Sequence, residues 1–143
     1  MKRRSPLTIV LALLCIGLGL WYEYGRGTVA TETPAGTIET AFAEQARDLP
    51  VEGEGVVLRI LSDDNDGSRH QRFVLELASG HTVLVAHNID LAPRLEGIAR
   101  GERVRFKGEY AWNPEGGVVH WTHHDPQGRH AGGWLEYRGT RFE

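Results

Sequence analysis

The chain has 143 residues, of which 41% are hydrophobic and 24% are charged, with a formal net charge of −3. This size and composition predict one domain with its own core plus an extension. Residues 37–143 hold 17 acidic and 12 basic side chains, which disfavours a non-specific nucleic-acid binder because such binders need an excess of cations. The single cysteine, Cys15, excludes an intrachain disulfide and any CxxC metal site.

Residues 1–27 carry the pattern of a membrane segment. Three basic residues at positions 2–4 precede an uncharged apolar run over 6–22, which is near the lower length limit of a membrane-spanning helix. Because basic flanks stay in the cytoplasm, we expect a bacterial inner-membrane protein with a single pass and a domain that faces the periplasm or exterior. The small residues required before a signal-peptide cleavage site occur only at 28–30. An uncleaved anchor is therefore favoured over a cleaved signal peptide or a buried soluble helix.

Residues 28–50 are interpreted as a linker followed by a short helix. The stretch 28–36 is small and polar, as linkers are. The stretch 37–49 then spaces apolar residues as one face of a helix does, and Pro50 follows it. The pattern predicts one short amphipathic helix that ends at the proline.

Residues 51–143 show the pattern of strands and turns. A helix is predicted over 90–101, because Asp90 is a candidate N-cap and Gly101 a candidate stop. The tail over 133–142 could add a sixth edge strand. The five main strands are predicted over 55–62, 72–79, 81–88, 103–112 and 118–124.

This order of elements predicts a mainly β fold. Three strands, a helix and two strands are the order of the OB-fold, a small five-stranded Greek-key barrel. Gly108 in the middle of a predicted strand suits the bend of such a barrel. A β-sandwich is the competing architecture, but it usually has seven strands. We therefore expect an OB-like barrel with one short helix over 51–143, preceded by the membrane helix and the short amphipathic helix.

Three stretches of the sequence resemble a bacterial family known as domain of unknown function 3465. They are RHQRFVLELASGHTVLVAHNIDLAPR (69–94), GEYAWNPEGGVVHWTHHDPQGRH (108–130) and GWLEYRG (133–139). The most specific parts are HNIDLAPR (87–94) and HWTHHDP (120–126), and the resemblance covers residues 51–143. The layout is also similar to that of small exported OB-fold proteins of bacteria. The family carries no established activity, and a fold does not imply a function.

Four of the seven histidines fall within residues 120–130, and strand alternation divides them. In an extended strand His120, Thr122 and His124 share one face, while the intervening residues share the other. Because Trp121 makes the better core residue, we expect the face of His120 to point outward.

A metal site is one interpretation of this region. His124 could close on an ion with either Asp125 or His130 through the turn that follows it, while His87 and Asn88 could approach from the end of another strand. Zinc is the metal that such ligands would suit, although the spacing matches no metal motif and no cofactor is expected. The alternatives are that the histidines anchor the loop through hydrogen bonds or form a ligand-recognition surface.

Catalysis is less favoured than binding. The GxSxG, HExxH and P-loop patterns do not occur in the sequence. A histidine base beside a carboxylate is available in His124 and Asp125, but neighbours on a strand point to opposite faces. The alternative function is a metal-dependent hydrolase or nuclease that uses the region 120–130.

A binding module is the favoured function. OB-folds bind oligomers on one barrel face through aromatic and basic side chains. Single-stranded nucleic acid, a glycan and an envelope protein are the candidate partners, besides the membrane that holds the N-terminal helix. The candidate ligand-binding residues are His87, Asn88, Arg103, Arg105, His120, Thr122, His124, Asp125 and His130.

Overall fold

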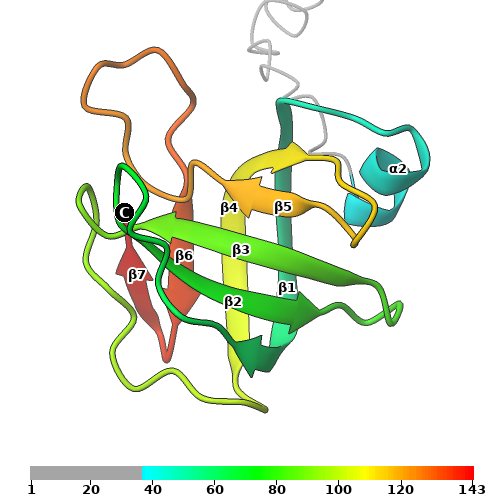
Figure 1. Ribbon diagram of the computed structural model, residues 1–143, viewed down its shortest axis with the longest axis horizontal. Helices are drawn as coiled ribbons and strands as arrows, with labels where there is room; N and C mark the ends of the chain where they lie inside the picture. The colour runs from blue at the N-terminus through cyan, green and yellow to red at the C-terminus, as the bar shows by residue number, and fades with distance from the viewer. Residues whose placement is uncertain (1–36) are drawn as a thin grey trace, which may run out of the picture. The chain divides into compact units, whose positions relative to one another are not determined.

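The computed structural model describes residues 37–143, so the predicted anchor over 1–27 and the linker over 28–36 lie outside the described residues. The described part is a mainly β domain (Figure 1). Within it, no helix has the length and hydropathy required to cross a membrane. Its elements are α2 (Ile38–Ala43), β1 (Leu49–Ile60), β2 (His70–Glu76), β3 (Thr82–Asn88), β4 (Arg103–Ala111), β5 (Val118–His120), β6 (Trp134–Tyr137) and β7 (Thr140–Phe142).

Strands β1 to β5 close into a barrel. β1 pairs antiparallel with β2 and also with β4, and β2 pairs antiparallel with β3. β5 completes the circle, because it pairs in parallel with β3 and antiparallel with β4. This is the strand order of an OB-fold, so the predicted fold is confirmed.

The C-terminal tail forms two strands where one was predicted. β6 pairs antiparallel with β4, and β7 pairs antiparallel with β6. β5 and β6 thus share one edge of β4, and the long loop over 121–133 leaves the sheet after β5 and returns at β6 (the orange loop in Figure 1).

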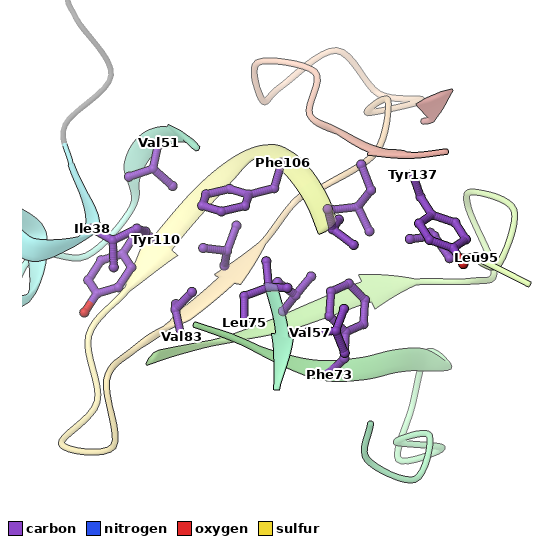
Figure 2. Close-up of a cluster of buried hydrophobic side chains, with 14 of the residues drawn as sticks. Ile38, Val51, Val57, Phe73, Leu75, Val83, Leu95, Phe106, Tyr110 and Tyr137 are labelled. Atoms are coloured by element: carbon purple, nitrogen blue, oxygen red, sulfur yellow. The ribbon is translucent and has the colours of Figure 1, made fainter. Parts of the chain in front are cut away.

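Alternating side chains of the strands fill the barrel (Figure 2). In β4, Val104, Phe106 and Tyr110 are buried while Arg103 and Arg105 are exposed, as the alternation predicts. Each fully buried side chain of this size contributes roughly 1.5–3 kcal/mol. The most deeply buried residues from the other strands include Val51, Val57, Phe73, Leu75, Val83, Val85, Val119 and Leu135.

Helix α2 closes one end of the barrel. Ile38 and Ala41 are buried in the core, and Phe42 contacts the His81 ring edge-on at 4.9 Å. The Thr37 side chain caps the helix by accepting the Thr40 N–H. The helix ends at Ala43, before the predicted end, and Pro50 lies inside β1.

The prediction of a helix over 90–101 is wrong, because this segment consists of turns and irregular backbone. The Gln71 carboxamide donates to the Leu95 carbonyl and accepts the Leu95 N–H, at 3.0 and 2.9 Å. His87 Nε2 bonds the Pro93 carbonyl at 3.1 Å. Each of these bonds pairs a backbone group with a side chain instead of with a helical partner. The result places Leu95 at the end of the core opposite Ile38 (Figure 2).

The strand predicted over 118–124 ends at His120. Trp121 has a φ of 52°, a left-handed conformation that interrupts the alternation. Its carbonyl oxygen lies against Gly133, where a Cβ would leave no room for it. Thr122 is therefore buried rather than outward, and Trp121 is half-buried at the surface rather than in the core.

We predict that Gly133→Ala destabilises the domain while Gly132→Ala does not. A Cβ at Gly133 would collide with the Trp121 carbonyl and would lie 2.6 Å from the Lys107 carbonyl oxygen. A Cβ at Gly132 would meet nothing within 4 Å. We expect the free energy of unfolding to fall by about 1–3 kcal/mol in the first variant and by less than about 0.5 kcal/mol in the second, as measured by urea denaturation. Equal losses in the two variants would contradict the contact.

Candidate functional site

Outward side chains form a row across β2, β3, β5 and β4. Strand pairing places Arg72 opposite Ala86, and Glu109 opposite His120. The parallel pairing of β3 with β5 joins these two pairs into one row. As a result, a histidine and a carboxylate lie side by side on the outer surface of the barrel.

A pocket of about 350 Å³ opens on this side of the barrel. OB-folds bind oligomers on the face of their second and third strands and through the β1–β2 and β4–β5 loops. This pocket shares β2, β3 and the β1–β2 loop with that face, while its other residues come from β5 and from the segments after β3 and β5. Its lining contains no arginine or lysine. The lining residues are Ser68, His70, Ala86, Asn88, Leu91, His120, Trp121 and His123.

Two connections that form the rim of this pocket are tied together. The Asp90 carboxylate accepts the Arg69 backbone N–H at 2.8 Å and Arg69 Nε at 2.7 Å. Arg94 forms an ion pair with Asp63, and Asn88 Oδ1 accepts the Asp90 N–H at 2.9 Å. The HNIDLAPR stretch therefore fastens the β3–β4 connection to the β1–β2 loop, while Asn88 also lines the pocket.

One carboxylate organises the loop over 121–133. Asp125 accepts the backbone N–H groups of Gln127, Arg129 and His130, at 2.9, 2.7 and 2.9 Å. These hydrogen bonds, that of Gln127 foremost, hold the pKa of Asp125 below its usual range. Both carboxylate oxygens are thus used inside the loop, which explains why this aspartate is buried.

His130 connects this loop to the barrel. Its ring stacks on that of Trp121 with the centroids 3.8 Å apart and the planes 15° apart. His130 Nδ1 lies 2.8 Å from Glu109 Oε1. Trp121 also lies next to the His123 ring, with the two ring centroids 5.3 Å apart. Trp121 therefore contacts two imidazoles at the edge of the pocket.

Asp48, just before β1, completes a cluster with Glu109 and His120. One ligand-type atom from each residue lies within 4.8 Å of the others. Burial lowers the pKa of His120, and the nearby carboxylates of Glu109 and Asp48 oppose that effect only in part. Sequence reasoning missed both carboxylates. Alternation placed Glu109 outward, but only the register of β4 against β5 brings it beside His120.

His87 and Thr122 lie inside the barrel, where they bond each other. The Pro93 carbonyl can only accept, so His87 Nε2 carries the proton, and Nδ1 accepts the Thr122 hydroxyl at 2.8 Å. Burial lowers the pKa of His87 to about 4. Both side chains were predicted to contact a ligand, yet their polar groups are paired within the protein.

His124, predicted with His130 to bind a metal, points into solvent. It lies outside the only group of three potential metal ligands in residues 37–143, which is Asp48, Glu109 and His120. The backbone carbonyl of His124 bonds His123 Nδ1 at 2.7 Å. The structure therefore keeps His130 near the cluster and leaves His124 apart from it.

Arg103 and Arg105 lie toward the other end of β4 and are paired with carboxylates. Arg103 Nη1 lies 2.6 Å from Glu54 Oε1, and Arg105 Nη1 lies 3.2 Å from Glu136 Oε1. At about 3.3 Å per residue, Arg105 is roughly 13 Å along the strand from Glu109. These two predicted ligand-binding arginines are therefore separate from the pocket, and both are paired with carboxylates.

The comparison with protein families agrees with the resemblance noted in the sequence. A family model described as "Protein of unknown function (DUF3465)" matches residues 25–143. No curated protein is significantly similar to the chain.

We predict that His87 makes the domain sensitive to mild acid. In the unfolded chain this histidine takes up a proton near pH 6.5, whereas in the folded protein it does so only near pH 4. The stabilisation that comes from keeping this histidine neutral is complete above pH 6.5. It is lost as the pH falls from 6.5 to about 4, which lowers the free energy of unfolding by roughly 3 kcal/mol in total. Urea denaturation at pH 7 and pH 4.5 should show a shallower loss of stability in His87→Gln than in the native protein.

The exposed His124 provides the matched control for this measurement. The variant His124→Gln removes one histidine from the surface and should keep the pH dependence of the native protein. If His87→Gln loses as much stability between the two pH values as the native chain does, the buried histidine is not the cause.

Proposed function

The chain belongs to DUF3465, a family of proteins of unknown function, and we propose that its barrel is a membrane-tethered module that binds a glycan of the bacterial envelope. The basic and apolar segment over 1–27 would hold the module at the inner membrane with its barrel in the periplasm. The observation that carries the proposal is the pocket beside Trp121, which lies where OB-folds bind oligomers.

The polar groups of the pocket suit a ligand rich in hydroxyl groups. His70 Nδ1 bonds the Ser68 carbonyl at 2.8 Å, and His123 Nδ1 bonds the His124 carbonyl at 2.7 Å. Because a carbonyl only accepts, both Nδ1 atoms carry protons, which leaves Nε2 of each neutral ring as an acceptor. Sugar hydroxyl groups are donors that would match the acceptor of His70, which is partly exposed, whereas His123 is buried.

Trp121 supports the same class of ligand. It gives the pocket a large, rigid aromatic surface, against which the apolar face of a sugar ring can pack. Stacking by His130 and the left-handed backbone fix its orientation. A side chain that is already ordered loses little conformational entropy when a ligand binds.

The charges of the domain favour a glycan over a nucleic acid. Binding of single-stranded nucleic acid depends on cations that contact phosphates, and the pocket lining has none. Arg72, which lies opposite the pocket residue Ala86, donates to the Ser62 carbonyl and lies 4.0 Å from Asp64. Farther away on β4, Arg103 and Arg105 are engaged with Glu54 and Glu136. The pocket volume is also that of a site for a small ligand, whereas docking of a whole protein uses a much broader surface.

We predict that Trp121→Asn weakens glycan binding at least tenfold, which corresponds to about 1.4 kcal/mol. Asparagine tolerates the left-handed backbone at this position, so the variant removes the aromatic surface without adding backbone strain. Calorimetry on the full-length chain in detergent would measure binding of N-acetylglucosamine oligomers, peptidoglycan fragments and core oligosaccharide of lipopolysaccharide.

The variant Arg105→Gln serves as the control, since it removes a charge that lies outside the pocket lining and leaves the pocket intact. It should bind glycans as the native chain does. Binding of none of the three glycans by the native chain would refute the proposal. A gel shift of a dT oligonucleotide at low salt that is lost in Arg105→Gln would instead support a nucleic-acid partner.

A further inference from the structure

The cluster of Asp48, Glu109 and His120 has a role that glycan binding does not require. We propose that these three side chains bind a divalent transition-metal ion, with zinc as the best-suited ion. The three residues come from the approach to β1, from β4 and from β5, and the barrel pairing brings one ligand-type atom of each within 4.8 Å of the others.

The donor set determines the class of ion. One imidazole nitrogen and two carboxylate oxygens suit zinc, which binds both at about 2.0–2.2 Å, whereas magnesium and calcium prefer oxygen ligands throughout. Ligands around a tetrahedral zinc ion lie about 3.4 Å apart. Side-chain rotations that close the present gaps by about an ångström would be sufficient to hold the ion.

The two carboxylates of the cluster lack the partners that other carboxylates of the domain have. Glu54, Glu102 and Glu136 each form an ion pair with an arginine. In the part of the chain that the structure describes, neither Asp48 nor Glu109 lies within ion-pair distance of an arginine or lysine. Two negative charges held close together repel each other, and a bound cation would neutralise both.

His130 supplies the outer support that metal ligands commonly have. Its Nδ1 lies 2.8 Å from Glu109 Oε1, which orients that carboxylate and leaves its other oxygen free for an ion. Its ring is fixed by the stack on Trp121, and its backbone N–H is bound by Asp125. The loop over 121–133 therefore acts through Glu109 rather than by direct coordination.

The cluster is open to solvent on the side of Asp48, which is exposed. An ion can enter from this side, and the fourth coordination position would be left to water or to a ligand. The backbone of Asp48 is left-handed, with a φ of 53°. Aspartate and asparagine are among the few residues that adopt this conformation readily, so the position can be altered without disturbing the fold.

The test is zinc binding by the full-length chain in detergent, stripped of metal with a chelator and titrated with zinc chloride in a calorimeter. We expect one zinc ion per chain. Asp48→Asn and His120→Gln should each weaken binding at least tenfold, while circular dichroism spectra remain those of the native chain. His124→Gln should bind zinc within twofold of the native chain, because this exposed histidine is not part of the cluster.

Two kinds of result would overturn the proposal. Absence of stoichiometric zinc from the native chain would reject the site. Unchanged zinc binding in Asp48→Asn, or a loss of binding in His124→Gln as large as in His120→Gln, would place the ion elsewhere. His120 belongs to both the pocket and the cluster. Zinc binding is therefore measured without glycan and glycan binding on the metal-free chain, so that the two proposals can fail separately.

Discussion

The parallel pairing of β3 with the short strand β5 is the contact on which both the barrel and its candidate site depend. It pairs Leu84 with Val118 and Val85 with Val119, and it extends by one hydrogen bond from the Leu84 N–H to the Gly117 carbonyl, at 3.1 Å. Gly117 is required here, since a Cβ would run into the Tyr110 ring. Without this pairing the barrel would be open between β3 and β5, and the outward row would be interrupted.

The sequence was sufficient to predict the barrel because its strands alternate strictly. Alternation identified the inward face of β4, and the order of strands identified the OB-fold. The prediction from the sequence was wrong in the segment after β3, where the backbone is bound by side chains and not by a neighbouring strand. Gln71 and His87 hold the segment after β3 in turns, although Asp90 and Gly101 carry the residue types of helix ends. A local pattern cannot reveal the hydrogen bonds of Leu95 to Gln71, which lies 24 positions away in the sequence.

The candidate site was predictable only in part, for a related reason. His120 and His130 stood out in the sequence, and both lie at the cluster. Their partner Glu109 lies on the charged face of β4 and has no sequence feature that sets it apart from the other surface residues. Only the register of β4 against β5 shows that it lies beside His120. The sequence predicts Trp121 in the core because the left-handed residue that ends β5 is not a glycine, so no residue type there indicates that the strand stops. The HWTHHDP stretch thus mainly forms the end of β5 and the start of the loop that follows it. The carboxylates that lie beside its histidine His120 come from elsewhere in the chain.

The Asp125 carboxylate makes the loop over 121–133 a single cooperative unit. Three amide hydrogens share this one acceptor, so they should exchange with solvent together through one opening event. That same event would remove Trp121 from the pocket and His130 from Glu109, because both side chains belong to the loop. A glycan and a metal ion would then favour the same closed state, and each would raise the affinity of the other by an equal factor.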